Sequence, residues 1–487
     1  MQTAFDSKVP IRVVCYERKH LWNSNMEAFK ELMGIRGLAA PTEPIALTGK
    51  DPVLSSRFSL GDTAACIQLA IGVAVNDLWE MSTGRRQGLS TKTEYAAAAL
   101  KSYQYLSVPF EQANQAFAMQ KRRQAISTPH LTKDGRYFLP HMGLTHLAKR
   151  ILKILNCDDE LSAIVEAVSR WDAQALEDAV AEVQGCGAMV RTEAEWLAHP
   201  QGKVLQLQPV IEIEKIADSD PEPLPQGALS APLASVRVLD LTRILAGPTC
   251  ARTLAEHGAD VLMVTSEHLP QTEYFVMDTS HGKRTTYLDL NVSEQKTKLL
   301  ELVKDADVFS QGYRPGVMSR LGLTPEGLAE LRPGLIYTSM NCYGSHGPWA
   351  ERAGWEQLAQ TVTGIAAEQG DERPQLLPAA VCDYTTGYLA AYGTLLAMGM
   401  RARDGGSYHV KASLCQSAMF LQRQRRVDFQ REGMEVSSDH IADITLITDT
   451  PYGEMKHLGP ILAMSETSPC WRLPSSPLGT HKAEWVA

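Results

Sequence analysis

The chain has 487 residues, of which 44% are hydrophobic and 21% charged, a balance typical of globular proteins and unlike that of disordered or fibrous chains. Its 47 lysines and arginines against 56 aspartates and glutamates give a net charge of −9, so we expect no general affinity for nucleic acids or anionic membranes. No run approaches the roughly 20 apolar residues that cross a bilayer, so a membrane-spanning protein is not expected either.

The first part of the chain is predominantly helical. An apolar run over 60–80 predicts a long buried helix, and 90–104 predict a strand followed by a helix. The segment KDGRYFL (133–139) predicts a turn leading into a strand. Residues 144–200 predict further helices, including an amphipathic one from Asp172 to Val183.

A proline-rich segment separates this part from the rest. Residues 217–235 contain four prolines and little periodicity, which is typical of a linker. Beyond it, β-branched runs alternate with helical segments. Strands are expected at 236–241, 259–264, 307–309 and 335–339, and helices at 248–257, 293–304 and 324–331. This alternation is typical of βαβ units and predicts an α/β protein with a doubly wound, mostly parallel, Rossmann-like sheet and a second, smaller α+β domain.

The two parts share an internal repeat. The segment 61–98 aligns without a gap on 382–419 at an offset of 321 residues, which places Asp62 on Asp383. Each segment contains an aspartate, an apolar helix, a glycine-containing turn and an alternating strand. Similar helix–turn–strand units also arise independently, but a gapless match with aligned glycines favours true repetition.

A second match extends the repeat. Residues 199–213 resemble 450–464 at an offset of 251. The two matches predict two truncated copies of one ancestral unit. The expected organisation is an N-terminal extension (1–50), a first copy with the small domain (51–216), the linker (217–235) and a second copy with the Rossmann-like half (236–487).

The thiols indicate the compartment. Nine cysteines are scattered without a CxxC or zinc-type spacing, which fits reduced thiols. The N-terminus lacks the apolar segment of a secretory signal. We therefore expect a cytoplasmic protein without a metal site.

Chemistry-bearing motifs point to one family. The chain has no GxGxxG, P-loop, HExxH or GxSxG, which removes the common nucleotide, metalloprotease and hydrolase signatures. Five segments in order nevertheless resemble the family III (CaiB/BaiF-type) CoA-transferases, which include formyl-CoA transferase and α-methylacyl-CoA racemase. They are VRVLDLTRILAGPTCARTLAEHGADVLMV (236–264), HGKRTTYLDLN (281–291), QGYRPGVMSRLGL (311–323), LIYTSMNCYGSHGPWAERAGWEQLAQTVTGI (335–365) and PAAVCDYTTGYLAAYG (378–393). The chain resembles a fused, partly degenerate two-copy member.

The resemblance implies a nucleophilic aspartate at Asp383. A carboxylate at this position attacks an acyl-CoA and forms a covalent intermediate. Asp383 also precedes an apolar helix, and aspartate is a common helix N-cap, so a purely structural role is the alternative from the residues alone. Its repeat counterpart Asp62 has no CoA-binding sheet of its own, and we interpret it as a structural cap.

The same resemblance implies a CoA site with acyl-CoA and a small carboxylic acid as substrates. Arg314 in the YRPG string, together with Lys283 and Arg284, is expected to face the CoA phosphates. Leu245, Ala246 and Gly247 precede a helix N-terminus, which favours anions. Each basic residue taken alone would more often be a solvated surface charge.

Four departures from the family pattern bear on the reaction. Trp355 stands where the racemases have a histidine, which disfavours racemisation, and Leu245 replaces a glutamine of the formyl-CoA transferases. The glycine-rich loop of some transferases has no counterpart near 425–450. Glu356 adds a second carboxylate that could have a raised pKa. The alternative hypothesis is therefore a lyase, isomerase or cyclase that uses Asp383 as a general base, with or without CoA.

The family resemblance also bears on subunit assembly, and several aromatic residues bear on the lining of the site. Some family members are interlocked dimers in which the small domain of one subunit covers the sheet of the other. We therefore expect a homodimer or a pseudo-dimer within one chain. Trp355, Tyr343, His346 and Tyr384 suggest an enclosed aromatic site, although core packing explains aromatic residues equally well.

Overall fold

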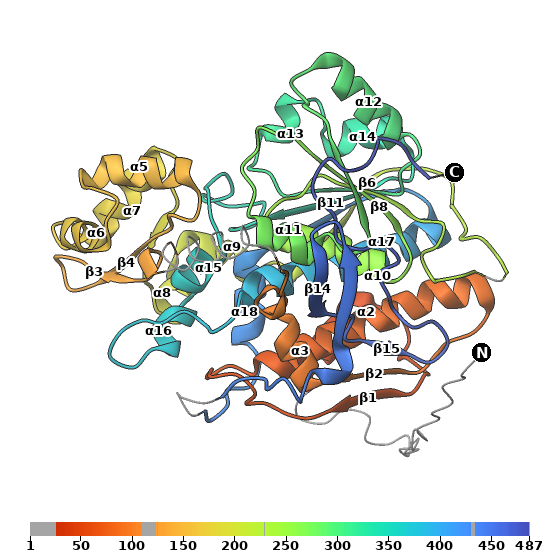
Figure 1. Ribbon diagram of the computed structural model, residues 1–487, viewed down its shortest axis with the longest axis horizontal. Coiled ribbons are helices and arrows are strands. Elements are labelled where there is room, and N and C mark those ends of the chain that lie inside the picture. The colour runs from red at the N-terminus through yellow and green to blue at the C-terminus, as the bar shows by residue number, and fades with distance from the viewer. Residues whose placement is uncertain (1–25, 110–122, 124, 228, 430–433, 487) are drawn as a thin grey trace.

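A seven-stranded sheet forms the centre of the protein in the computed structural model, which describes residues 26–109, 123, 125–227, 229–429 and 434–486 (Figure 1). In spatial order the strands are β6 (Ile211–Ala217), β12 (Ser407–Ser413), β11 (Ile336–Asn341), β10 (Val308–Gln311), β7 (Arg237–Asp240), β8 (Asp260–Thr265) and β9 (Lys283–Tyr287). All neighbouring strands are parallel except β6, which runs antiparallel to β12. The chain leaves β7 toward β8 on one side and returns to β10 on the other, so the strand order reverses there.

Helices cover both faces of this sheet. Successive side chains of a strand point to opposite faces, and nearly all of those in β7, β8, β10 and β11 are buried. Leu239, Leu262 and Phe309 pack toward α12 (Ser293–Val303) and α14 (Pro325–Leu331). Val238 and Val308 belong to the core shared with α10 (Ala246–Glu256) and α17 (Val381–Asp404). The α/β class and the strands and helices expected after the linker are confirmed.

Two long helices have matching surroundings. The helices α2 (Leu60–Thr83) and α17 each have 24 residues, and their bounds differ by the offset of 321 seen in the sequence. Each is followed by a strand and a helix: β2 (Leu89–Lys92) and α3 (Thr93–Ala99) after α2, and β12 and α18 (Leu414–Gln422) after α17. The two long helices pack against one another in the centre of the molecule.

A small sheet reproduces part of the large one. It contains β1 (Ile45–Thr48), β2 and β15 (Ala463–Met464), with β1–β2 parallel and β15–β2 antiparallel. The large sheet has the same arrangement in β11, β12 and β6. The pair Met464–Leu89 corresponds to the pair Ile213–Val410 when both sequence offsets are applied. The last strand of each matched segment therefore pairs with the sheet of the other half.

A separate small domain lies at one end of the molecule (Figure 1). It has an antiparallel sheet of β3 (His130–Leu131), β4 (Tyr137–Pro140) and β5 (Gly187–Met189). Three helices pack on it: α5 (Thr145–Leu155), α6 (Leu161–Val168) and α7 (Ala173–Glu182). The predicted turn and strand at 133–139 and the amphipathic helix after Asp172 are confirmed.

The remaining elements connect these units. They are α1 (Glu27–Arg36), the 3-10 turns η1 (Ser102–Tyr105) and η2 (Ala442–Ile444), α8 (Glu193–Ala198), α9 (Pro200–Gln206), α11 (Glu273–Thr279), α13 (Val317–Arg320), α15 (Glu356–Thr363), α16 (Ile365–Gln369), and the hairpin β13 (Thr445–Thr450)–β14 (Gly453–Leu458). Within the described ranges, no helix combines the length and the apolar character needed to cross a membrane. Much of the expected extension 1–50 lies outside the described residues.

Candidate active site

A cleft opens where three parallel strands end. Its volume is about 220 Å³, and loops after β7, β10 and β11 contribute to its wall. The small domain closes it from another side with Leu144, His146 and Leu147. Asp383 and Trp355 also line it. The cleft thus lies at the carboxyl edge of the sheet, near the reversal of strand order, where open α/β sheets bind ligands.

Asp383 lies in the first turn of α17. Asp383 is 9% exposed and lines the cleft. The N-cap of α17 is Ala380, so the alternative interpretation of Asp383 as the N-cap is wrong. Because the first N–H groups of a helix carry partial positive charge, this position favours the ionised carboxyl group.

Glu356 performs the capping from a different helix. It is the first residue of α15, and its Oε2 accepts a hydrogen bond of 2.8 Å from the backbone N–H of Asp383. Gln360 donates to Oε1 over 2.5 Å. The two acidic residues proposed from the sequence are therefore adjacent in the structure. Glu356 is 2% exposed and lies behind Asp383, outside the lining of the cleft.

Burial changes the acidity of both carboxyl groups. Desolvation raises the pKa of Glu356 to about 7, against hydrogen bonds that favour its ionised form. Desolvation, followed by the negative charge of Glu356, raises the pKa of Asp383 well above its usual value. Two buried carboxyl groups this close retain a proton near neutral pH. The pair can hold and transfer a proton, and a carboxyl group can act as a nucleophile only when it is ionised.

The loop before α10 approaches Asp383 closely because of two glycines. A Cβ on Gly247 would lie 2.2 Å from the Cβ of Thr242, and one on Gly387 would lie 2.4 Å from the carbonyl oxygen of Ala246. Ile244 has a φ of 72°, a strained value for a β-branched residue. As expected, residues 245–247 line the cleft. The N-termini of α10 and α17 therefore meet at one end of it.

Positive charge in the cleft comes from more than one element. Arg314 follows β10 and donates to the carbonyl oxygen of Gln184 in the small domain over 3.3 Å. Arg243 lines the same cleft, and its Nε has no hydrogen-bond partner among the described residues. Sequence reasoning missed Arg243, although it directly precedes the ILAGP string. It also missed His146 of the small domain, for which no local signal exists.

The structure corrects the prediction for Lys283. This side chain is fully buried, and its Nζ lies 2.8 Å from Oδ2 of Asp240 and 2.8 Å from the carbonyl oxygen of Pro248. Arg284 makes an ion pair of 2.8 Å with Asp260 and also lies outside the cleft wall. Both basic groups are neutralised within the fold, so neither is oriented toward a phosphate.

One of the four aromatic candidates reaches the cleft. Trp355 lines it and stacks on His141 of the small domain, with ring centroids 4.5 Å apart. Tyr343 is buried elsewhere, and the Tyr384 hydroxyl bonds to Ser102 and Asp278. His346 lies 51% exposed, 3.5 Å from Glu212. Core packing accounts for the two tyrosines.

Asp62 occupies the corresponding position in α2. Its N–H donates to Oδ2 of Asp51 over 2.7 Å, much as that of Asp383 donates to Glu356. Its carboxylate accepts hydrogen bonds from Thr93 over 2.9 Å and Arg425 over 3.1 Å. Both oxygens are thus engaged, and Asp62 is 2% exposed. The N-cap of α2 is Ser59, so Asp62 is a structural residue but not the cap itself.

Together these features define an α/β protein in which a buried carboxyl group, that of Asp383, lines a cleft at the carboxyl edge of the sheet. Residues 233–452 match CoA-transferase family III. Over this region the chain is similar to CoA-transferase family III. Within the described residues, no cluster of three histidines, cysteines or acidic residues could hold a metal ion.

Three similar proteins carry related names. The acetyl-coenzyme A transferase nodX of Hypoxylon pulicicidum is 33% identical over 60% of this chain and 54% of its own length. An acyl-CoA transferase of Gibberella moniliformis is 30% identical over 67% of this chain and 66% of its own. A crystal structure of a CaiB/BaiF family protein from Brucella suis has 30% identity and a TM-score of 0.37, covering 46% of this chain and 65% of that one. The chain thus spans about half to two thirds of these relatives.

Proposed function

We propose that the protein is an acyl-CoA:carboxylate CoA-transferase with Asp383 as the nucleophile. The observation that carries this proposal is the position of Asp383, which lines the cleft at a helix N-terminus within the region matching the family. The names of the relatives support CoA thioesters as the substrate class. The individual steps of the reaction follow from the chemistry of a carboxylate nucleophile.

The proposed reaction transfers CoA from one carboxylic acid to another through two kinds of covalent intermediate on Asp383, a mixed anhydride and an aspartyl-CoA thioester. The ionised Asp383 oxygen attacks the thioester carbonyl carbon, and the carbon–sulfur bond breaks. CoA thiolate departs, and the acyl group is joined to Asp383 as a mixed anhydride. The thiolate then attacks the aspartyl carbonyl, releases the donor acid and forms an aspartyl-CoA thioester. The acceptor carboxylate attacks this thioester, which expels the thiolate and forms a second mixed anhydride. The thiolate then attacks the acceptor's acyl carbon, which yields the new acyl-CoA and releases Asp383. Each step conserves charge and needs no external oxidant or reductant.

The surrounding groups suit these steps. The N-terminus of α10 at residues 245–247 can stabilise oxygen charge that develops at the reacting carbonyl. Arg314 and Arg243 provide guanidinium groups for CoA phosphates. The small domain and Trp355 restrict access of water to the anhydride, which would otherwise hydrolyse.

We infer that one chain contains two truncated copies of the family unit and a single active site. The equal lengths of α2 and α17 and the matching strand registers support this inference. The small domain of the first copy covers the doubly wound sheet of the second, as in a pseudo-dimer. Asp62, held by Thr93 and Arg425, leaves the first copy without a free nucleophile.

An isotope-exchange assay tests the proposal. The change is Asp383→Asn, and Asp62→Asn is the matched control on the other long helix. We expect the exchange of labelled acetate into acetyl-CoA to fall by at least about a thousandfold in Asp383→Asn, since loss of a covalent nucleophile typically costs this much. Asp62→Asn should retain exchange within a few fold. If the unsubstituted protein does not exchange acetate, other short acyl-CoA and acid pairs are used for the assay. Full exchange by Asp383→Asn with the pair that the unsubstituted protein accepts would contradict the proposal.

The second candidate is general-base chemistry by Asp383 on a lyase, isomerase or cyclase substrate. The raised pKa of Asp383 favours it, because a carboxyl group whose pKa lies above its usual value is a stronger base and holds a proton more readily. Titration calorimetry with CoA separates the two candidates. Binding of CoA that weakens in Arg314→Gln favours the transferase, and absence of CoA binding favours a CoA-independent reaction.

A further inference from the structure

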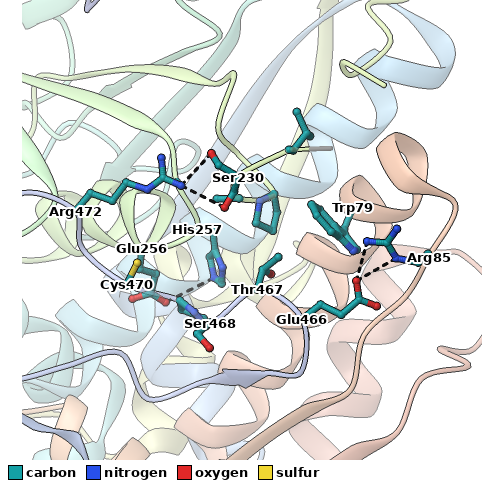
Figure 2. Close-up of a pocket in the computed structure, with 15 residues that line it drawn as sticks. Trp79, Arg85, Ser230, Glu256, His257, Glu466, Thr467, Ser468, Cys470 and Arg472 are labelled. Carbon is teal, nitrogen blue, oxygen red and sulfur yellow. Dashed lines mark hydrogen bonds and ion pairs between the residues drawn. The ribbon is translucent and has the colours of Figure 1, made fainter. Parts of the chain in front are cut away.

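A second cavity of about 360 Å³ shares no lining residue with the Asp383 cleft (Figure 2). Four segments distant in the sequence form it: the end of α2 with the turn after it, residues 229–232, the end of α10, and residues 466–472. Its volume lies in the range of small-molecule sites. It is therefore a candidate site in its own right, independent of the proposed transferase activity.

Two arginines lie on opposite sides of this cavity, with His257 between them in Figure 2. Arg85 donates to Oε2 of Glu466 through Nε over 3.1 Å and Nη2 over 2.9 Å. Arg472 donates through Nη2 to the hydroxyl of Ser230 over 3.1 Å and to its carbonyl oxygen over 3.3 Å. In the described part of the chain the Nη1 groups of both arginines make no hydrogen bond, so each keeps donors for a ligand.

The inner wall is polar and uncharged at neutral pH. Glu256 and His257 are both buried, 3.6 Å apart. Burial raises the pKa of Glu256 to about 8 and lowers that of His257 to about 4, so both groups are neutral near pH 7. Neither ring nitrogen of His257 has a hydrogen-bond partner among the described residues. The wall therefore does not repel an anion, and its polar groups disfavour an apolar ligand.

We propose that this cavity binds a small dicarboxylate, with one carboxylate at Arg85 and the other at Arg472. Two separated guanidinium groups fit a ligand whose two negative charges are also separated, because each can form a charge-assisted hydrogen bond with one carboxylate. A monocarboxylate or a single phosphate offers only one such anionic group. Glu466 neutralises part of the charge of Arg85 and leaves the charged side chains of the lining with an excess of one positive charge.

Titration calorimetry with succinate on the full chain tests this site. The Asp383→Asn variant is used in parallel to remove the proposed nucleophile, so that the test does not depend on the transferase activity. We expect one succinate per chain in both proteins. The double variant Arg85→Gln/Arg472→Gln should bind it at least tenfold more weakly. Arg373→Gln, at an exposed arginine outside both cavities, should leave the affinity unchanged.

A second variant and two comparison ligands make the outcome decisive. Glu466→Gln removes the competing carboxylate of Arg85 and should tighten succinate binding. Butyrate and inorganic phosphate should bind at least tenfold more weakly than succinate. No binding of succinate at millimolar concentration, unchanged binding in the double variant, or equal affinity for butyrate or phosphate would each overturn the proposal.

Discussion

The central residues are two carboxyl groups that the fold places on adjacent helices. The position of Glu356 at the start of α15 brings its Oε2 to the backbone N–H of Asp383. This contact holds the first turn of α17 and places a second acid behind Asp383. Under the proposed function, the pair must release a proton before Asp383 attacks, and we expect the rate to rise with pH through the titration of the pair.

Replacing Glu356 tests whether its pKa is raised in the folded protein, because a raised pKa makes the free energy of unfolding depend on pH. Its pKa is raised from 4.5 to about 7 in the folded protein. The folded state then binds more protons than the unfolded state between these values, so this group's contribution to stability falls as pH rises. Compared with the unsubstituted protein, Glu356→Gln should become relatively more stable from about pH 5 to pH 8, by on the order of 3 kcal/mol. Urea unfolding at several pH values measures this difference, and an opposite or absent trend would contradict the assignment.

At the scale of single elements, local sequence patterns predict structure well where one periodicity dominates. The apolar run at 60–80 and the β-branched runs after the linker form helix α2 and strands β7 and β8. The second repeat match behaves differently. Residues 200–206 form helix α9, with Pro200 in its first turn and His199 as the cap, whereas most of the matching 451–457 lies in strand β14, which pairs with β13. Whether such a segment becomes a helix or a strand depends on the strands available to pair with it, and the local sequence does not reveal these partners.

Side-chain pairing between elements is equally hidden in the sequence. Lys283 lies in a string that resembles a CoA-binding segment, but β9 points it into the core toward Asp240 on β7. Arg243 follows β7 and lines the cleft instead. The residues of β-strands alternate between faces, so a strand's register and its neighbours determine which basic group is free.

The pair of Lys283 and Asp240 gives a prediction about stability. Both side chains are fully buried. Lys283→Met should lower the free energy of unfolding by about 3–5 kcal/mol, because it leaves Asp240 without its counter-ion. The double variant Lys283→Met/Asp240→Asn should recover much of this loss. Guanidinium unfolding measures both. A stable Lys283→Met protein with weakened CoA binding would instead restore Lys283 to the ligand site.

At the scale of the whole molecule, the cleft at Asp383 combines distant parts of one chain. The small domain supplies Leu144 and His146, and the sheet and α17 supply Arg314 and Asp383. The exchanged strands β6 and β15 tie the two halves together. The alignment of Asp62 with Asp383 predicts two related helices, but only their surroundings distinguish them: Asp62 is enclosed by Thr93 and Arg425, and Asp383 faces a cleft.

Chemical trapping of the acyl intermediate tests the central claim most directly. The protein is incubated with acetyl-, propionyl- or succinyl-CoA and hydroxylamine, and its peptides are analysed by mass spectrometry. Hydroxylamine converts an activated aspartyl group to a stable hydroxamate. We predict one hydroxamate per chain, on the peptide that contains Asp383 and with none on the peptide that contains Asp62. Unmodified Asp383 under conditions of measurable CoA transfer, or modification of Asp62 instead, would contradict the account.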